Sequence, residues 1–476
     1  MLLGTKFHKL AENNVDYWMK PDTALTTEDI TKKLVNLEWD EKANLQIYIH
    51  VPFCTQKCSF CAFSGGNSVE FEEARNYANL VILQLSDIYE KTKLKNKPID
   101  TIHIGGGSPD LLNAQIGILL EYLVNLPGFQ ARTELAVEFS LFSVRDEFLN
   151  ELAKYPVTKA SFGVQTLNPS IRKNIKMPPR LRRMDEVCEK LRRTIPVLNV
   201  DLMTGFPEQS LDDVISDLCF FIDHPHVNCI SSYLFSQGSA PAFIADVIAG
   251  NIPTPPTESH HANLRLHTFS TLQRSGWQRY GTNTYIDVTD VPSDILLKIK
   301  GNECLGAHAY HDFLIAVGAS AIGYFPGLRY ENKTSLEDWM QDVKQGRLPY
   351  DLTKSSLEDQ ADMALWGFPL NYHGLKKTDY DELVINRIID DYQQNTFKDF
   401  LSQGLIYLGS DGIYNLTITG EVFQGHIVKG LKKKPDQNVI SEYIQDGYQR
   451  ANLAANGIAT IENKLNNRQK KLNRDD

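Results

Sequence analysis

The sequence lacks an apolar run long enough to cross a bilayer, and its first residues lack the apolar core of a signal peptide. It also lacks an excess of positive charge, because 59 Asp and Glu outnumber 49 Lys and Arg and give a formal net charge of -10. Its seven cysteines are an odd number without a disulfide framework. We therefore expect a cytoplasmic protein without a membrane partner. General nucleic-acid binding is not expected, since binding phosphates requires excess Lys and Arg.

The chain does have a regular alternation of β-rich runs and amphipathic helical stretches from residue 45 to residue 234. This alternation is typical of βαβ units and a parallel sheet. Six strands with intervening helices favour a curled, partly open α/β barrel over a flat doubly wound sheet. The expected strands are Leu45–Val51, Thr101–Ile104, Leu135–Phe139, Thr158–Val164, Val197–Met203 and Cys229–Leu234.

The pattern changes at 237–257, which is rich in Gly, Pro and Ser, and again near Ser355, where Ser355 and Glu358 form a capping box. After that box we expect a helix ending at Gly404, a strand at 405–407, a turn and a strand at 413–417, an order that resembles a winged helix. The expected segments are an N-terminal segment 1–43, a core 44–236, an extension 237–354 that completes the active site, a winged-helix-like domain 355–431 and a polar helical tail 432–476.

Cys54, Cys58 and Cys61 are spaced CxxxCxxC directly after a predicted strand. Three thiolates on a tight loop can bind three irons of a four-iron four-sulfur (4Fe-4S) cluster and leave the fourth iron without a protein ligand. The alternative is zinc, which usually takes a fourth Cys or His at matching spacing. His50 is expected on the preceding strand, so the spacing favours the cluster. The isolated Cys188, Cys219, Cys229 and Cys304 are expected to be small core residues.

The spacing, with the aromatic Phe60 before the third cysteine, resembles the signature of the radical S-adenosylmethionine (SAM) family. The segment YxHxPFC that begins at Tyr48 resembles its oxygen-independent coproporphyrinogen III oxidase-like subfamily, as do TIHIGGGSPDLL at 101–112, ASFGVQTL at 160–167 and NVDLMTGFP at 199–207. The section 355–430 resembles its C-terminal domain. The resemblance implies a partial TIM-like radical SAM barrel of six β/α units with a winged-helix-like domain after it.

The resemblance also implies a 4Fe-4S cluster on the three cysteines and SAM bound to its open iron. It gives catalytic roles to the cysteines and to Tyr48, which is expected at the methionyl end of SAM. The glycines of 105–107 let backbone approach this end closely. Phe60 is expected against adenine. The remaining expected contacts to the cofactor are Gly106, Gly107, Ser108, Glu138, Gln165, Asp201 and Met203.

Several positions depart from the oxidase pattern: Phe63 stands where the oxidase has a further cysteine, and Met177 where the family tends to carry Arg. The turn 238–241 and the stretch 317–323 resemble relatives that bind two SAM molecules and transfer methyl or methylene carbon. For a second SAM we expect contacts from Gly318 and Ala319, with Tyr233 and Phe235 opposite.

The expected reaction is therefore radical C-methylation of an unsaturated substrate, such as a tetrapyrrole or another aromatic. A 5′-deoxyadenosyl radical made from one SAM activates the methyl group of the other. The alternatives are oxidative decarboxylation of a porphyrinogen and haem chaperoning without catalysis. A flavodoxin or ferredoxin-like protein is the expected electron donor.

Other features allow two interpretations each. The segment 172–193 holds nine Lys or Arg against three acids and either binds substrate carboxylates or is a solvated helix face. His308 and His311 could have a chemical role, as a haem ligand or a proton donor. The other interpretation is that they are ordinary surface or packing residues. His260 and His261 begin a helix and are expected on the surface. The winged-helix-like domain is expected to be an accessory domain rather than a DNA-binding one.

Overall fold

The computed structural model describes residues 43–61 except 57, 69–235 except 180 and 182, 312–354 except 327, and 374–431. It also describes residues 23, 24, 36, 243, 246, 247, 249–253, 256–281, 283–299 and 365. Several predictions concern residues outside this set. They are those for most of the segment 1–43, where only residues 23, 24, 36 and 43 are described, and those for Phe63, the turn 238–241, the capping box at Ser355 and Glu358, His308, His311 and the tail 432–476.

Six parallel strands in chain order form the centre of the sheet, and they confirm the predicted α/β core. Each predicted strand is present to within two residues at either end. All seven residues of the first are buried, as expected for a parallel strand covered on both faces. The strands are β2 (Leu45–Val51), β3 (Thr101–Gly106), β4 (Glu134–Phe139), β5 (Lys159–Gln165), β6 (Val197–Thr204) and β7 (Cys229–Leu234).

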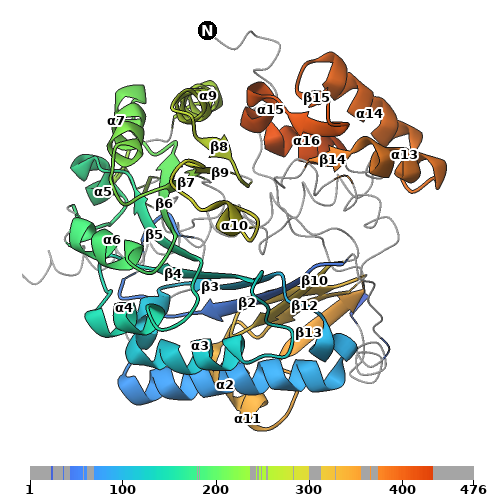
Figure 1. The fold of residues 1–476 in the computed structure, drawn as a ribbon. Coiled ribbons are helices and arrows are strands. Elements are labelled where there is room, and N and C mark those ends of the chain that lie inside the picture. The colour runs from blue at the N-terminus through green and yellow to red at the C-terminus, as the bar shows by residue number, and fades with distance from the viewer. Residues whose placement is uncertain are drawn as a thin grey trace, which may run out of the picture.

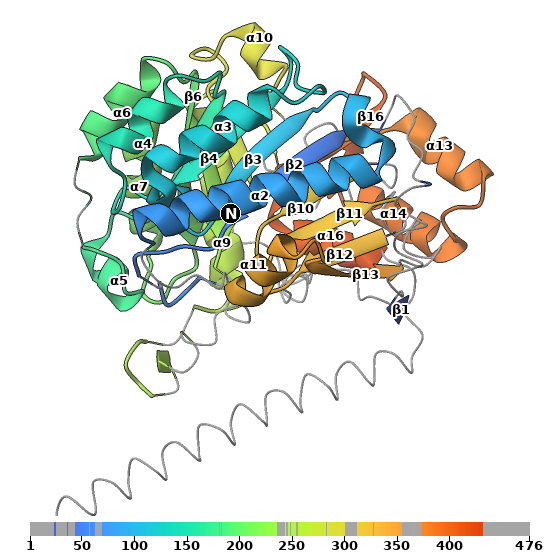
Figure 2. The same cartoon turned by 90° about the horizontal axis from the view of Figure 1, so that it is seen from below.

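Helices connect these strands, and α2, α3 and α4 cover the outer face of the sheet (Figure 1). Seen from below, α2 runs across β2 and β3 (Figure 2). The predicted cap of α7 is present, since Ser210 and Asp213 form a capping box. The helical elements of the core are α2 (Phe71–Lys91), η2 (Lys93–Asn96), η3 (Pro109–Gln115), α3 (Ile116–Val124), α4 (Asp146–Leu152), α5 (Pro169–Asn174), α6 (Met184–Arg192) and α7 (Leu211–Ile222).

Further strands extend the sheet at both edges, where the sequence predicted mostly irregular structure. β10 (Phe313–Val317) is parallel to β2, and three antiparallel strands follow beyond it: β11 (Ile322–Phe325), β12 (Leu328–Asn332) and β13 (Tyr350–Lys354). β13 also pairs with β1 (Thr23–Ala24). At the other edge lie β9 (Thr284–Ile286) and β8 (Gln278–Arg279). Within the described residues the two edges do not pair, so the sheet is open. The accompanying helices are α9 (Glu258–Arg274), α10 (Ser293–Leu296) and α11 (Leu336–Lys344).

A second, three-stranded antiparallel sheet with four helices follows at 375–431, in an order consistent with the expected winged helix. It contacts the core through α15, where Tyr285 donates a hydrogen bond to Glu421 and Arg265 donates to the Val422 carbonyl at 3.0 Å. The elements are β14 (Leu375–Lys376), α13 (Lys377–Ile385), α14 (Asp391–Ser402), β15 (Ile406–Leu408), β16 (Ile413–Leu416), α15 (Ile418–Val422) and α16 (Gln424–Leu431). The domain boundaries themselves remain predictions.

Candidate functional site

The three motif cysteines follow β2 in a loop, here called the cluster loop (residues 52–61). Its first residues are bound to the end of β3, because Gly107 donates its amide proton to the Val51 carbonyl at 2.7 Å and Ser108 donates to the Phe53 carbonyl at 2.6 Å. Farther along, the Ser59 amide donates to the Ile175 carbonyl, just past α5, at 3.2 Å. Two separate parts of the barrel, the end of β3 and the end of α5, therefore hold the loop by its backbone.

The glycines after β3 are needed because every Cβ added there would meet another part of the site. At Gly105 it would lie 2.7 Å from a carboxylate oxygen of Glu138, and at Gly106 it would lie 2.6 Å from the His50 ring. At Gly107 it would lie 2.3 Å from the Phe53 carbonyl oxygen and 3.1 Å from the sulfur of Cys54. The predicted close approach of backbone therefore occurs, and at Gly107 the neighbour is a motif cysteine.

The three thiols influence one another electrostatically without converging on one point. Burial raises the pKa of Cys58 to about 11, and the neighbouring Cys61 and Cys54 contribute. Yet in the described part of the chain no three His, Cys, Asp or Glu side chains are arranged to hold a single metal ion. A cubane fits this arrangement, because each of its cysteines binds a different iron. Ser108 donates to the Cys54 sulfur at 3.9 Å.

The register of the sheet places the predicted side chains of the strands on one face. Adjacent partners on parallel strands share a face, and Tyr48 pairs with His103 while Met203 pairs with Tyr233. Paired residues on adjacent strands share a face, and so do residues two apart on one strand. Following these relations from His103 leads to Glu138 on β4, Asp201 on β6 and Tyr233 on β7. We call this group the polar cluster: Tyr48, His50, His103, Glu138, Asp201 and Tyr233.

Glu138 is the most strongly bonded acid of the polar cluster. Its Oε1 lies 2.8 Å from His103 Nε2, and its Oε2 accepts the Gly106 amide proton at 3.3 Å. Burial raises the pKa of Glu138, but the charge and hydrogen bond of His103 and the Gly106 amide outweigh this effect, so the pKa lies below its usual value. Its side chain is still 30% exposed. A carboxylate is thus presented beside the glycines expected at the methionyl end of SAM.

Asp201 behaves differently from Glu138. Burial raises the pKa of Asp201 to about 7, and the charge of Glu138 adds to the shift, while Asn199 donates to its Oδ1 at 2.8 Å. Desolvation raises the pKa of the half-buried Tyr233, and the same two carboxyls add to the shift. At the methionyl end, the Tyr48 hydroxyl and His50 Nδ1 share a hydrogen bond of 2.9 Å, and burial lowers the pKa of His50 to about 4. The His50 ring is therefore neutral near pH 7.

Gln165 and the expected adenine contact lie at the same end of the barrel. Gln165 ends β5 with a φ of 67°, a left-handed conformation that is uncommon outside glycine. Phe60 packs edge-to-face on Phe206, with ring centres 5.7 Å apart. Phe60 and Met203 border an apolar cluster, here called the aromatic wall, made of Ile171, Ile175, Met177, Phe206, Phe235, Phe243 and Ile252.

Gly318 and Ala319, the residues expected at a second SAM, are enclosed by protein. A Cβ on Gly318 would lie 2.4 Å from the His50 carbonyl oxygen, and its amide donates to Gln84 Oε1 of α2 at 3.0 Å. Ala319 is 0% exposed. Close packing therefore explains the small residues here, and the second site remains a prediction.

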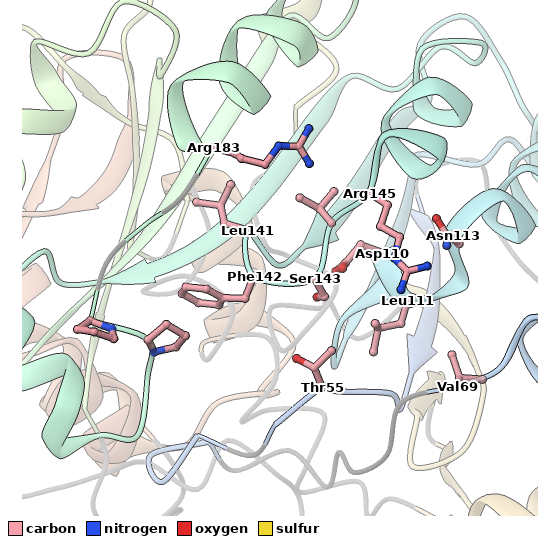
Figure 3. Close-up of a pocket in the computed structure, with 13 residues that line it drawn as sticks. Thr55, Val69, Asp110, Leu111, Asn113, Leu141, Phe142, Ser143, Arg145 and Arg183 are labelled. Atoms are coloured by element: carbon pink, nitrogen blue, oxygen red, sulfur yellow. The ribbon is translucent and has the colours of Figure 1, made fainter.

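A pocket of about 760 Å³ borders the cluster loop at Thr55 (Figure 3). It contains none of the residues predicted to contact SAM. Burial raises the pKa of Asp110, one of its lining residues, to about 6. The pocket is lined by Thr55, Val69, Asp110, Leu111, Asn113, Leu141, Phe142, Ser143, Val144, Arg145, Pro178, Pro179 and Arg183.

Four residues differ from their sequence interpretation or were missed by it. Cys219 of α7 was expected in the core, but it is exposed, whereas Cys188 and Cys229 are buried as expected and Cys304 lies outside the described residues. His261 was expected on the surface, but it is only 9% exposed because α9 packs it against Gly205. His103 was not predicted, although its alternation with Gly105 on a buried strand places it on the ligand-facing side. Arg172 does not belong to a basic surface, since it is 1% exposed, whereas Arg183 is exposed and paired with Asp146.

The model of the Radical SAM superfamily matches residues 48–220. These residues contain the cluster loop, the glycines and most of the polar cluster. Residues 48–220 therefore form a radical SAM domain. This match confirms the resemblance, and a 4Fe-4S cluster and SAM are the cofactors that the superfamily implies.

Haem chaperones and coproporphyrinogen III oxidases are among the relatives that the chain resembles. The chain is 24% identical to the heme chaperone HemW of Bacillus subtilis over 389 residues, 80% of this chain and 97% of that protein. It is 24% identical to HemW of Buchnera aphidicola over 242 residues, and this alignment covers 51% of this chain and 62% of that protein. The chain thus spans less than two thirds of that relative's length. It is 24% identical over 320 residues to the anaerobic coproporphyrinogen III oxidase 1 of Cereibacter sphaeroides, 65% of this chain and 69% of that protein.

The fold is that of a solved structure described as coproporphyrinogen III oxidase (HemN) from Escherichia coli, a radical SAM enzyme. The TM-score is 0.67 at 17% identity, covering 88% of this chain and 97% of that one. The partial radical SAM barrel expected from the sequence is confirmed. These relatives support the two alternatives better than they support methyl transfer. Among the described residues, no helix combines the length and apolar character that a membrane crossing requires.

Proposed function

We propose that this radical SAM enzyme acts on a tetrapyrrole and abstracts hydrogen from it in an oxidase-type reaction. The observation that carries the proposal is that Cys54 lies next to Gly107 and Glu138 next to Gly106, at the same end of the barrel. Cys54, Cys58 and Cys61 would hold the cluster there, and it would supply the electron for reductive cleavage of SAM to a 5′-deoxyadenosyl radical. Flavodoxin or a ferredoxin-like protein is the proposed electron donor.

The chain's own residues bind and orient SAM in this proposal. Backbone at Gly106 and Gly107 accepts the methionyl end, because no side chain stands there. Glu138 is ionised and fixed by His103 at 2.8 Å, so it presents a negative charge to the cationic groups of SAM. Phe60 supplies an aromatic surface for adenine. Asp201, with its pKa raised to about 7, can hold or release a proton near neutral pH.

The aromatic wall backs the expected adenine contact. Phe206, Phe235 and Phe243 are buried and pack on one another in tilted and edge-to-face arrangements, with ring centres 5.2 and 4.6 Å apart, and Phe206 in turn contacts the partly exposed Phe60. An aromatic face for a planar ligand is therefore offered by Phe60, and the buried rings hold it in place. The names of the relatives, haem chaperone and coproporphyrinogen III oxidase, support a tetrapyrrole as the substrate.

Haem chaperoning is the second candidate, and the alignment with 97% of the Bacillus subtilis HemW favours it. Methyl transfer would additionally need the second SAM, and the close packing around Gly318 and Ala319 gives it no support.

Anaerobic turnover separates these functions. Reconstituted protein is incubated with SAM, a chemical reductant and either coproporphyrinogen III or haem. We expect 5′-deoxyadenosine with carbon dioxide from the porphyrinogen, and no product from Cys58→Ala protein. S-adenosylhomocysteine together with 5′-deoxyadenosine would indicate methyl transfer instead. Haem binding without cleavage of SAM in the presence of either tetrapyrrole would contradict the enzymatic proposal and support the chaperone.

A further inference from the structure

Arg172 is a fully buried cation whose hydrogen-bonding capacity is only partly used. It lies in α5 and is 1% exposed. Its Nε donates to the Pro178 carbonyl at 2.6 Å, and its Nη1 donates to the carbonyls of Val164 and Thr166 at 2.6 and 2.8 Å. Nη2, which carries two further protons, is buried and has no hydrogen-bond partner. A buried charged donor without a partner is unfavourable and calls for an explanation.

The carbonyls that Arg172 holds belong to the end of β5. Val164 and Thr166 flank Gln165, whose φ of 67° needs support from its surroundings. A single guanidinium nitrogen bridges the two carbonyls on either side of Gln165, so Arg172 fixes the backbone that presents this predicted SAM contact. The fork of a guanidinium lets Nε hold the Pro178 carbonyl at the same time, whereas an ammonium group, with one nitrogen, would not reproduce this spread of donors.

The other side of the guanidinium lies near the cluster loop. Its central carbon is 5.4 Å from the centre of the Phe142 ring, and both Phe142 and Cys58 pack against the aromatic wall. Burial lowers the pKa of Arg172 to about 10, while the opposite charges of Cys58 and Asp217 act to raise it. Asp217 already accepts from the Leu167 amide at 2.9 Å. The cluster loop is held next to α5 as well, because the amide of Ser59, the residue after Cys58, donates to the carbonyl of Ile175, three residues after Arg172, at 3.2 Å. A Cys58 sulfur bound to iron is therefore an acceptor within this neighbourhood.

We propose that Arg172 is a positioning residue that joins the two halves of the site: Nη1 fixes the strand end at Gln165, and Nη2 donates to the Cys58 sulfur when it binds iron. The inference rests on the proposed function, because it assumes a cluster on Cys58. A cation beside the cluster stabilises the reduced form, which carries one more negative charge. Arg172 therefore raises the reduction potential of the cluster and makes the electron easier to deliver.

The test compares Arg172→Gln, Arg172→Lys and Lys173→Gln in the full-length, anaerobically reconstituted protein. Lys173 is the matched control, since it is the next residue of α5 and is exposed. Midpoint potentials come from redox titration followed by electron paramagnetic resonance, and SAM affinity comes from equilibrium dialysis. For Arg172→Gln we expect the ratio of reduced to oxidised cluster at a fixed potential to fall about tenfold, which is about 59 mV for a one-electron couple.

Arg172→Lys keeps the charge but lacks the fork, so we expect a potential near the wild-type value and roughly tenfold weaker binding of SAM. The same potential in Arg172→Gln and Lys173→Gln would overturn the inference. If the Arg172→Gln protein cannot hold iron, the test rests on Arg172→Lys. Wild-type affinity for SAM in Arg172→Lys would then overturn the inference. Wild-type protein without a cluster would overturn the proposed function as well, whereas the preceding outcomes leave that function standing.

Discussion

The substitution Gly107→Ala tests whether the missing side chain at Gly107 is what lets the cluster loop lie directly against the end of β3. The added methyl carbon would lie 2.3 Å from the Phe53 carbonyl oxygen and 2.9 Å from the Val51 carbonyl oxygen. Both neighbours are backbone atoms, so no flexible side chain can move aside. The φ of Gly107 is not positive, and any effect must therefore come from this contact rather than from strain in the backbone angle.

The expected destabilisation follows from what must move. Relief of the contact separates the cluster loop from the end of β3 and breaks at least one of the hydrogen bonds from Gly107 and Ser108, at 2.7 and 2.6 Å. Overpacking and the lost bond together should reduce the free energy of unfolding by about 2–4 kcal/mol. The sulfur of Cys54, 3.1 Å from the added carbon, would shift as well, so the variant should hold less iron.

Thermal unfolding and iron content after anaerobic reconstitution measure these two effects. Gly346→Ala is the matched control, because its φ is 65° and nothing lies within 4 Å of the added carbon. That variant should lose about 1–2 kcal/mol from its backbone angle alone and keep its iron. Wild-type iron content and stability in Gly107→Ala would refute the close approach of β3 to the cluster loop.

Three further predictions follow from the site. Replacing Cys54, Cys58 and Cys61 together by Ala should abolish the brown chromophore, whereas Cys188→Ala should keep it; iron retained in the triple variant would contradict the cluster. The raised pKa keeps the Asp201 carboxyl protonated in the folded protein at pH values where it is already ionised in the unfolded chain. The protein should therefore lose folding stability as pH rises from about 4 to about 7. Asp201→Asn should therefore gain in melting temperature relative to wild type over that range, and a difference independent of pH would contradict this. Glu421→Gln removes the buried negative charge that Arg279 faces at 3.5 Å and that accepts from Tyr285, and it should cost about 3 kcal/mol, measured as faster proteolytic release of 374–431; unchanged release would contradict the coupling.

The parallel core was predictable because its signals are local. Each of the six strands is a short, mostly buried run between helical stretches, and helices such as α7 carry their own capping residues. The cysteine spacing is also local, so the cluster loop could be recognised directly. The antiparallel strands β11 to β13 were missed because their partners lie within a section without clear periodicity, and sheet pairing there is set by register rather than by composition.

Burial of polar residues could not be predicted in the same way. Arg172 stands in a run of basic residues, and nothing in the run distinguishes it from the exposed Lys173. Its burial depends on three carbonyls that the turn after β5 and the end of α5 bring together. His261 is buried because α9 packs against Gly205, a contact between distant parts of the sequence. Such positions depend on tertiary structure, and local pattern assigns them to the surface by default.

The polar cluster shows why the site suits a cationic cofactor. Glu138 and Asp201 face the same space, and the charge of Glu138 helps to keep Asp201 protonated up to about pH 7. Two neighbouring carboxyls repel each other when both are ionised, so one of them stays protonated. A bound cation reduces this repulsion and lets both carboxyls carry a negative charge. SAM carries both a sulfonium and an ammonium group, so its binding would favour ionisation of Asp201 and release a proton near neutral pH. Affinity for SAM should therefore increase with pH through about 7, and this dependence should disappear in Asp201→Asn.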